Sequence, residues 1–253
     1  RLEQQMRHAQ KLESLGVLAG GIAHDFNNLL VSMLGHASLA LEDVPADAPV
    51  RRSLEQIERA AHRAAELTNQ MLAYAGRGTL AVRPLDATTL VREMGELLRT
   101  VISKRVRLVY DLEDGLPAIA ADAGQLRQVV MNLLTNASDA CQGRDGTLTL
   151  RTYIKKLTPE EARPSPGARQ THEFRAGERV LMTEIDDTGT GVPDDKLSRV
   201  FEPFYTTKAA GKGTGLGLTV SRKIVELHEG GIRIHNLDPR GARVTITLRT
   251  ERT

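Results

Sequence analysis

The sequence predicts a hairpin of two long helices followed by a mixed α/β domain. Over the N-terminal third, apolar residues recur at steps of three and four, which is typical of amphipathic helices. After residue 79, strand-like runs alternate with helical ones, which favours a sheet with helices on one face. The 253 residues, of which 40% are hydrophobic, suffice for one or two domains with a sizeable core.

The first predicted helix carries one apolar stripe and is about 40 residues, or about 60 Å, long at 1.5 Å per residue. It ends near "EDVPADAP", where two prolines and three acidic residues indicate a turn. Its stripe consists of Leu15, Leu18, Ile22, Phe26, Leu29, Met33 and Ala37. The second helix carries a stripe of Val50, Leu54, Ile57, Ala61, Ala64 and Met71.

Two such helices cannot bury both wide apolar faces against each other. We therefore expect a homodimer in which two hairpins form a four-helix bundle. The alternative is a hairpin that packs on the rest of its own chain. The second stripe fades at "AGRGT", which predicts a dimerisation domain at 1–76, a linker at 77–80 and a second domain at 81–253.

The second domain reads as a mixed sheet with helices on one face. Its strand-like runs are 80–85, 105–112, 147–154, 178–187, 232–236 and 242–250. Its helical runs are 86–103, 122–142 and 215–229. The segment 158–176 is rich in Pro, Gly and charge, so we expect a mobile loop there.

Composition limits the partners and the compartment. Low aromatic content (3%), no Trp and a net charge of only +2 argue against a nucleic-acid partner and against direct membrane contact of this fragment. One cysteine, Cys141, and no apolar run near the roughly 18 residues of a spanning helix favour the cytoplasm. The chain begins in helical rhythm without Met. We therefore expect a missing N-terminal sensor module, with a parent protein that is either soluble or membrane-anchored.

A polar cluster interrupts the first helix at "GGIAHDFNNLLVSMLG", residues 20–35. His24 lies about 200° around the helix from the core residue Ile22, so it points outward. Asp25 is adjacent and Asn28 is one turn further on. An imidazole with a neighbouring carboxylate can act as a nucleophile, whereas a metal pair would need a second histidine. An ordinary solvated face is the other interpretation.

Three further motifs lie in the second domain. "DDTGTGVP" (186–193) ends a strand-like run, and "GKGTGLGL" (211–218) precedes a helical one, where glycines let backbone N–H groups approach phosphates. Glycines used only for turns are the alternative. A P-loop is excluded because Lys212 is followed by Gly213, and the spacing does not fit a dinucleotide fingerprint. In "QVVMNLLTNASDA" (128–140), Asn132 and Asn136 lie one turn apart and are candidates for holding Mg²⁺, unless they form a plain polar face.

Taken together, these motifs resemble the cytoplasmic core of bacterial sensor histidine kinases. "HDFNNLL" resembles the phospho-acceptor box and "NLLTNASDA" the asparagine box. "DDTGTG" and "GKGTGLGL" resemble the two glycine boxes, and "FEPFYTTK" (201–208) resembles the phenylalanine box. The motifs follow the family order over almost the whole chain. The form "LAGGIAHDFNNLL" is most similar to kinases with PAS-type sensors, many of them hybrids with a receiver domain.

The resemblance implies a sandwich fold of the gyrase, Hsp90 and histidine-kinase ATPase type for the second domain, with ATP and Mg²⁺ as cofactors. His24 would be phosphorylated, Asp25 would accept its proton, and Asn28 would assist dephosphorylation. Asn136 would hold Mg²⁺ with support from Asn132. Asp187 would accept a hydrogen bond from the adenine amino group. The remaining implied contacts to ATP are Gly189, Gly191, Lys208, Gly213, Thr214, Gly215, Leu216 and Gly217, with a lid at about 192–212.

The implied partner is a response-regulator receiver domain, which would take the phosphoryl group on an aspartate. Gln128 stands where ATP-hydrolysing relatives use a carboxylate, which fits transfer to histidine rather than hydrolysis. Two alternatives remain at this stage. One is a dimeric ATP-binding scaffold or phosphatase-dominant regulator, and the other is a gyrase-like or chaperone-like ATPase, which would leave His24 and the hairpin unexplained.

Overall fold

The computed structural model describes residues 29–45, 47–74, 81–99, 102, 104–141, 143–162, 174–208 and 214–250, with only the backbone for 62, 63 and 66–74. The chain divides into two compact units, Arg1–Thr79 and Leu80–Thr253. Among the described residues, no helix combines the length and the apolar composition that a bilayer crossing requires.

Unit 1 contains a hairpin of two helices, a helical segment at 29–43 and α2 (Pro49–Tyr74). The Arg51 guanidinium closes the turn, because its Nη1 donates to the carbonyl oxygens of Leu41 at 3.0 Å and Val44 at 2.8 Å. Within one chain, Leu30, Ala37 and Ala61 are buried. Four predicted stripe residues remain at least half exposed: Leu29, Met33, Val50 and Ile57.

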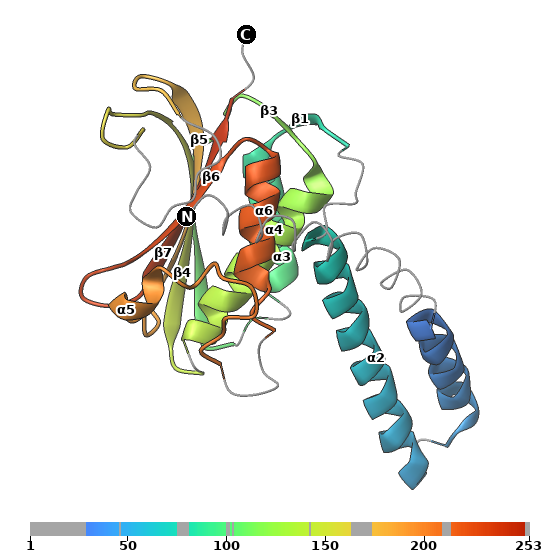
Figure 1. The fold of residues 1–253 in the computed structure, drawn as a ribbon. Helices are drawn as coiled ribbons and strands as arrows, with labels where there is room; N and C mark the ends of the chain where they lie inside the picture. The colour runs from blue at the N-terminus through green and yellow to red at the C-terminus, as the bar shows by residue number, and fades with distance from the viewer. Residues whose placement is uncertain are drawn as a thin grey trace, which may run out of the picture. The chain divides into compact units, whose positions relative to one another are not determined.

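Unit 2 is built on a five-stranded sheet (Figure 1). Its strands lie in the order β2 (Val106–Leu112), β4 (Gly146–Lys156), β5 (Arg179–Asp187), β7 (Ala242–Arg249) and β6 (Gly231–Asn236). β2 and β4 are parallel and the other neighbours are antiparallel, so the predicted mixed sheet is confirmed. A second sheet pairs the short strands β1 (Arg83–Leu85) and β3 (Ile119–Ala121).

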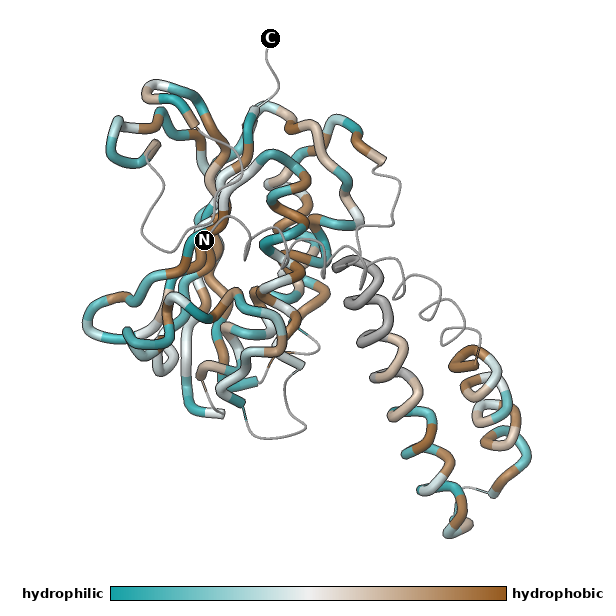
Figure 2. Tube along the Cα trace, viewed as in Figure 1, coloured by the Kyte–Doolittle hydropathy of each residue, from teal (hydrophilic) through white to brown (hydrophobic). Residues whose placement is uncertain are grey.

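Three helices cover one face of the five-stranded sheet: α3 (Ala87–Leu98), α4 (Ala123–Ala140) and α6 (Gly217–Leu227). Figure 2 shows apolar segments along these helices and along the inner strands. The fully buried side chains between the two layers include Val91, Leu98, Val129, Leu133, Leu134, Leu148, Leu150, Leu181, Ile185 and Ile224. This apolar core holds α4 and α6, the two helices that carry predicted site residues, against the sheet.

The start of α4 is fixed by Asp122. Its Oδ1 accepts a hydrogen bond from Gln125 N at 3.0 Å, which is the usual role of an aspartate at a helix N-terminus. Its Oδ2 accepts from Ala81 N at 3.0 Å, so the first described residue after position 80 is attached to α4. His228 Nε2 accepts from Asp122 N at 2.9 Å, which connects the C-terminal end of α6 to the same point.

The opposite face of the sheet is polar at its centre and apolar at one end. Although burial opposes its ionisation, hydrogen bonds from Arg243 and Arg151 hold the pKa of Asp186 below its usual range. The apolar end is a small cluster of Leu157, Phe174, Val180 and Met182. The described ends of the predicted loop at 158–176 lie outside the helices and strands; Phe174 is buried and Thr158 N donates to Glu161 Oε2 at 3.1 Å.

Candidate functional site

The predicted site residues fall into two groups. The phospho-acceptor candidates His24, Asp25 and Asn28 lie outside the described residues, as does Gly213. The other predicted nucleotide-site residues lie in unit 2, and all of them are described.

The asparagine motif on α4 and the second glycine motif at the start of α6 lie against each other. Asn132 Nδ2 donates to the Gly217 carbonyl oxygen at 3.4 Å. A Cβ atom on Gly217 would lie 3.8 Å from Asn136 Nδ2, so Asn136 is also close to this backbone. The fold therefore brings together two motifs that are 85 positions apart in the chain.

Lys208, the last residue of the phenylalanine motif, reaches the same end of α4. Its Nζ donates to Asn136 Oδ1 at 3.1 Å and to Asp139 Oδ2 at 2.6 Å. The ion pair is partly exposed, since the side chains of Lys208 and Asp139 are 34% and 54% accessible. The amide oxygen of Asn136 and a carboxylate oxygen of Asp139 thus both bind the Lys208 ammonium group.

The second glycine motif has a conformation that only glycine adopts easily. Gly215 has φ +67°, and a Cβ atom on it would overlap the backbone of Phe204. Leu216 is buried and its N–H donates to Thr214 Oγ1 at 3.3 Å. Helix α6 starts directly after this turn, so its first N–H groups and its dipole are available to an anion.

Asp187 ends β5 as a buried acceptor. Its Oδ1 accepts hydrogen bonds from Gly189 N at 2.7 Å and from Ala242 N at 3.3 Å. Burial raises the pKa of Asp187, and these two bonds offset the rise only in part, while the adjacent Asp186 charge adds to it. Within the described part of the chain, Oδ2 accepts no hydrogen bond. The Asp187 carboxylate is therefore fixed through Oδ1, and Oδ2 is available to accept a hydrogen bond from a ligand.

The first glycine motif packs on the C-terminal end of α4. A Cβ atom on Gly189 would lie 2.7 Å from the Ala140 backbone, which leaves room only for glycine. Thr190 N donates to the Ala140 carbonyl oxygen at 3.3 Å. The predicted adenine end and the predicted phosphate end of the site are thus both built against α4.

Sequence reasoning missed three residues that shape this motif, Asn236, Arg240 and Gly241. Asn236 bonds to Val192, and Arg240 Nε donates to the Gly189 carbonyl oxygen at 2.8 Å. Gly241 has φ +107°, and a Cβ atom on it would overlap the Asp187 carbonyl oxygen. The sequence "NLDPRG" at 236–241 indicates a turn between two strands, but nothing in it points to the motif that it contacts.

The oxygen ligand that α4 offers fits Mg²⁺ only if phosphate oxygens complete its coordination. Asn136 supplies one amide oxygen, which suits a cation that usually keeps water and phosphate ligands. In the described ranges, no group of three or more His, Cys, Asp and Glu side chains is placed to hold a metal ion. The described residues therefore offer no site that would coordinate a metal ion through such side chains alone.

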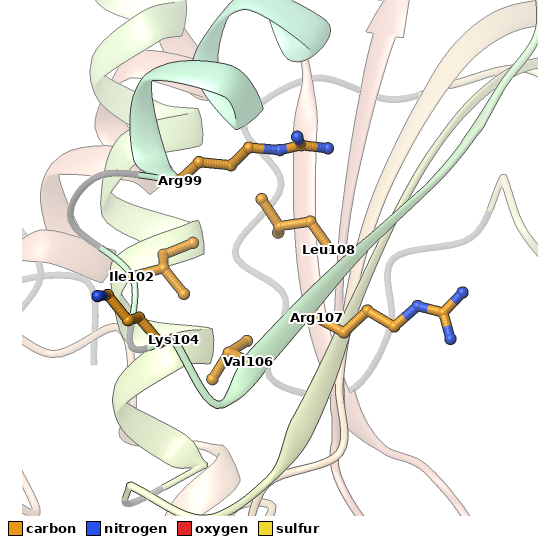
Figure 3. A pocket seen from close by; sticks show the side chains of 6 residues that line it. All are labelled: Arg99, Ile102, Lys104, Val106, Arg107 and Leu108. Carbon is orange, nitrogen blue, oxygen red and sulfur yellow. The ribbon is translucent and has the colours of Figure 1, made fainter.

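A separate cavity of about 230 Å³ lies at the connection between α3 and β2 (Figure 3). Apolar side chains of Ile102, Val106 and Leu108 line it together with three basic residues. Figure 3 shows Arg107 pointing away from Ile102, so the basic groups do not converge. The cavity contains none of the predicted site residues.

Two family models match the chain, one for each unit. Residues 121–252 match the model described as "Histidine kinase-, DNA gyrase B-, and HSP90-like ATPase". Residues 14–78 match the "His Kinase A (phospho-acceptor) domain".

Comparison with individual proteins agrees with these two family models. The chain is 40% identical to the sensor kinase CckA of Brucella abortus over 91% of its own length and 24% of the relative. It is 31% identical to the sensor histidine kinase ZraS of Escherichia coli K12 over 98% of its own length and 48% of the relative. The chain thus spans a quarter to a half of these curated relatives. The solved structure of full-length ShkA with AMPPNP has the same fold, with a TM-score of 0.71 at 24% identity over 93% of this chain and 46% of that one.

Proposed function

The chain belongs to the sensor histidine kinases, and from this premise we propose that it is the autophosphorylating core of such a kinase. In this proposal, unit 2 binds ATP and Mg²⁺, and the γ-phosphoryl group is transferred to His24. The phosphohistidine then donates to an aspartate of a response-regulator receiver domain. The single observation that carries the proposal is the convergence of the asparagine, phenylalanine and second glycine motifs at one end of α4.

The proposed transfer divides the work between the two units. The adenine amino group donates to Asp187, and the phosphates lie near Lys208 and the N-terminus of α6. Asn136 would hold Mg²⁺, which would neutralise phosphate charge when bound with ATP. A His24 ring nitrogen attacks the γ-phosphorus, and the bond to the bridging oxygen of ADP breaks. Asp25 holds or takes the proton on the other ring nitrogen, and Asn28 positions a water molecule or partner group when the phosphoryl group is removed.

We also propose that two chains form a four-helix bundle. The exposure of Leu29, Met33, Val50 and Ile57 supports a homodimer, because one hairpin leaves these side chains uncovered. The ThkA histidine kinase, which has a similar fold with a TM-score of 0.61 at 20% identity, was solved with the response regulator TrrA.

The experiment that tests the kinase proposal is transfer of labelled γ-phosphate from Mg-ATP to the whole chain. We expect acid-labile, alkali-stable label in the wild type and none in His24→Gln. His36→Gln is the matched control, because His36 is an exposed histidine of the same predicted helix and should keep the label. ATP binding without label in the wild type would contradict autophosphorylation by this chain and favour the ATP-binding scaffold or the phosphatase-dominant regulator. Steady ATP turnover without a phosphorylated chain would favour a plain ATPase.

The contact between Lys208 and Asp139 leads to a second prediction. Asp139 competes with the ATP phosphates for the Lys208 ammonium, so Asp139→Asn is expected to tighten Mg-ATP binding. A partly exposed ion pair limits the gain to about fivefold in Kd. Calorimetric titration with Mg-ATP measures it, and Lys208→Met, which removes the ammonium itself, should weaken binding. If Asp139→Asn instead weakens the binding of Mg-ATP, Asp139 itself contributes to the binding site.

A further inference from the structure

The side-chain amide of Asn236 forms a two-point contact with the end of the first glycine motif. Its Oδ1 accepts a hydrogen bond from Val192 N at 2.8 Å, and its Nδ2 donates to the Val192 carbonyl oxygen at 2.7 Å. The amide thus bonds to both the N–H and the carbonyl group of Val192, as the backbone of a residue in a neighbouring β-strand would do. The Nδ2 atom also donates to Asp194 Oδ1 at 3.2 Å, at the first residue of α5 (Asp194–Leu197).

The turn that this contact fixes is strained for any residue but glycine. Gly191, the neighbour of Val192, has φ +70°, and a Cβ atom on it would lie 2.9 Å from Asn236 Oδ1. At the other glycine of the motif, Arg240 Nε donates to the Gly189 carbonyl oxygen. Two side chains from β6 and the turn after it therefore hold the motif near both of its glycines.

The position of the motif determines how Asp187 is held. Of the two N–H groups that donate to Asp187 Oδ1, that of Gly189 forms the shorter hydrogen bond. Gly189 also lies between Asp187 and Val192 in the chain. When Val192 is fixed, the short loop from Asp187 to Val192 has both ends fixed. Without Asn236, this loop keeps the bonds of Thr190 N to the Ala140 carbonyl oxygen and of Arg240 Nε to the Gly189 carbonyl oxygen but loses those that Asn236 forms with Val192. Gly189 N is then held less firmly against Asp187 Oδ1, and the carboxylate is less well oriented.

We propose that Asn236 is a positioning residue for recognition of the nucleotide base, a role that rests on the proposed binding of adenine by Asp187. Asn236 acts through Val192 and the loop, because the hydrogen bonds of its amide go to Val192 and Asp194 rather than to Asp187. Its side chain is exposed. Truncation to alanine therefore leaves no core cavity, and the effect on base recognition is separable from the effect on folding.

The test measures Kd for ATP and for GTP on the whole chain, together with the thermal midpoint. Because losing hydrogen bonds of this kind changes an equilibrium constant by about tenfold, Asn236→Ala is expected to raise the ATP Kd by about that factor. GTP, whose base offers no amino group in the adenine position, should bind as in the wild type. The preference for ATP over GTP then falls about tenfold. His235→Ala changes the preceding exposed residue of β6 and is expected to retain the wild-type values of both Kd and Tm.

Two results would overturn the role of Asn236. One is an unchanged ATP Kd in Asn236→Ala, and the other is an equal loss of ATP and GTP affinity, which would indicate general loosening of the domain. A wild-type chain that binds no ATP would instead overturn the proposed function itself, and the role of Asn236 with it. The wild-type titration therefore distinguishes the two failures.

Discussion

Replacing Asp187 by asparagine is expected to abolish ATP binding while making the ligand-free protein more stable. The asparagine keeps an oxygen for the N–H groups of Gly189 and Ala242. Its NH₂ group, however, then faces the adenine amino group, and two donors oppose each other. Loss of a charged acceptor, which contributes about 1.5–3 kcal/mol, together with this opposition predicts at least about a 100-fold rise in the ATP Kd. Titration with ATP measures this rise.

The gain in stability follows from the raised pKa of Asp187, which is caused first by burial. A carboxyl group whose folded-state pKa exceeds its unfolded value binds its proton more tightly in the folded protein. Its stabilising contribution is present below the unfolded pKa and is lost as the pH rises through the folded pKa. We therefore expect Asp187→Asn to raise Tm at neutral pH, with a difference that shrinks below about pH 4, the unperturbed range of aspartate.

The adjacent residue provides the matched control. Asp186 receives hydrogen bonds from Arg151 and Arg243 on the opposite face of the sheet, and its pKa is lowered. Its ionised form therefore stabilises the fold at neutral pH. Asp186→Asn should lower Tm and leave the ATP Kd near the wild-type value. If Asp187→Asn binds ATP normally, the proposed adenine acceptor is wrong, and a fall in its Tm at neutral pH would contradict the burial argument.

Gly241→Ala is expected to destabilise unit 2 strongly. Residue 241 has φ +107°, which disfavours alanine by about 1–3 kcal/mol. The added Cβ atom would also overlap the Asp187 carbonyl oxygen, and overpacking of this kind costs about 1–3 kcal/mol more. For a domain of this size, the sum corresponds to a Tm lower by about 10 °C. ATP binding should be lost as well, because Ala242 N is the next donor to Asp187.

Gly115→Ala separates the two causes. Gly115 has φ +71°, but its missing Cβ atom has nothing within 4 Å, so alanine adds backbone strain without overlap. Thermal unfolding of both variants measures the difference. Equal losses of Tm would show that the contact between residue 241 and Asp187 is unimportant.

Much of unit 2 could be predicted because its elements are long enough to show a period. The strands β4 and β5 and the helix α4 were predicted within a few residues of their observed bounds. β3 and α5, with three and four residues, span little more than one period of a strand or helix pattern and were missed. The strand order β2-β4-β5-β7-β6 depends on pairings between distant segments, which no local pattern contains.

The candidate site divides in the same way. Asp187, Asn132 and Asn136 are recognisable in motifs, and the structure places the two asparagines beside the second glycine motif. The predicted contact of Lys208 with phosphates stays a prediction, since here it pairs with Asp139. Asn236 was missed because its partner Val192 is 44 positions away, and one asparagine at the end of a strand carries no signal of that distance.

The two hydrogen bonds that fix Asp187 also have a consequence for how the protein is made. One donor follows Asp187 by two positions, and the other, Ala242, follows it by 55 and opens β7. On the ribosome, β5 is therefore complete well before its neighbour β7 exists. A nascent chain that lacks β7 has an incompletely held acceptor and an unpaired side of β5. With the proposed role of Asp187, ATP would stabilise only molecules whose synthesis has passed this strand, and it would help to maintain the finished domain rather than assist its first folding.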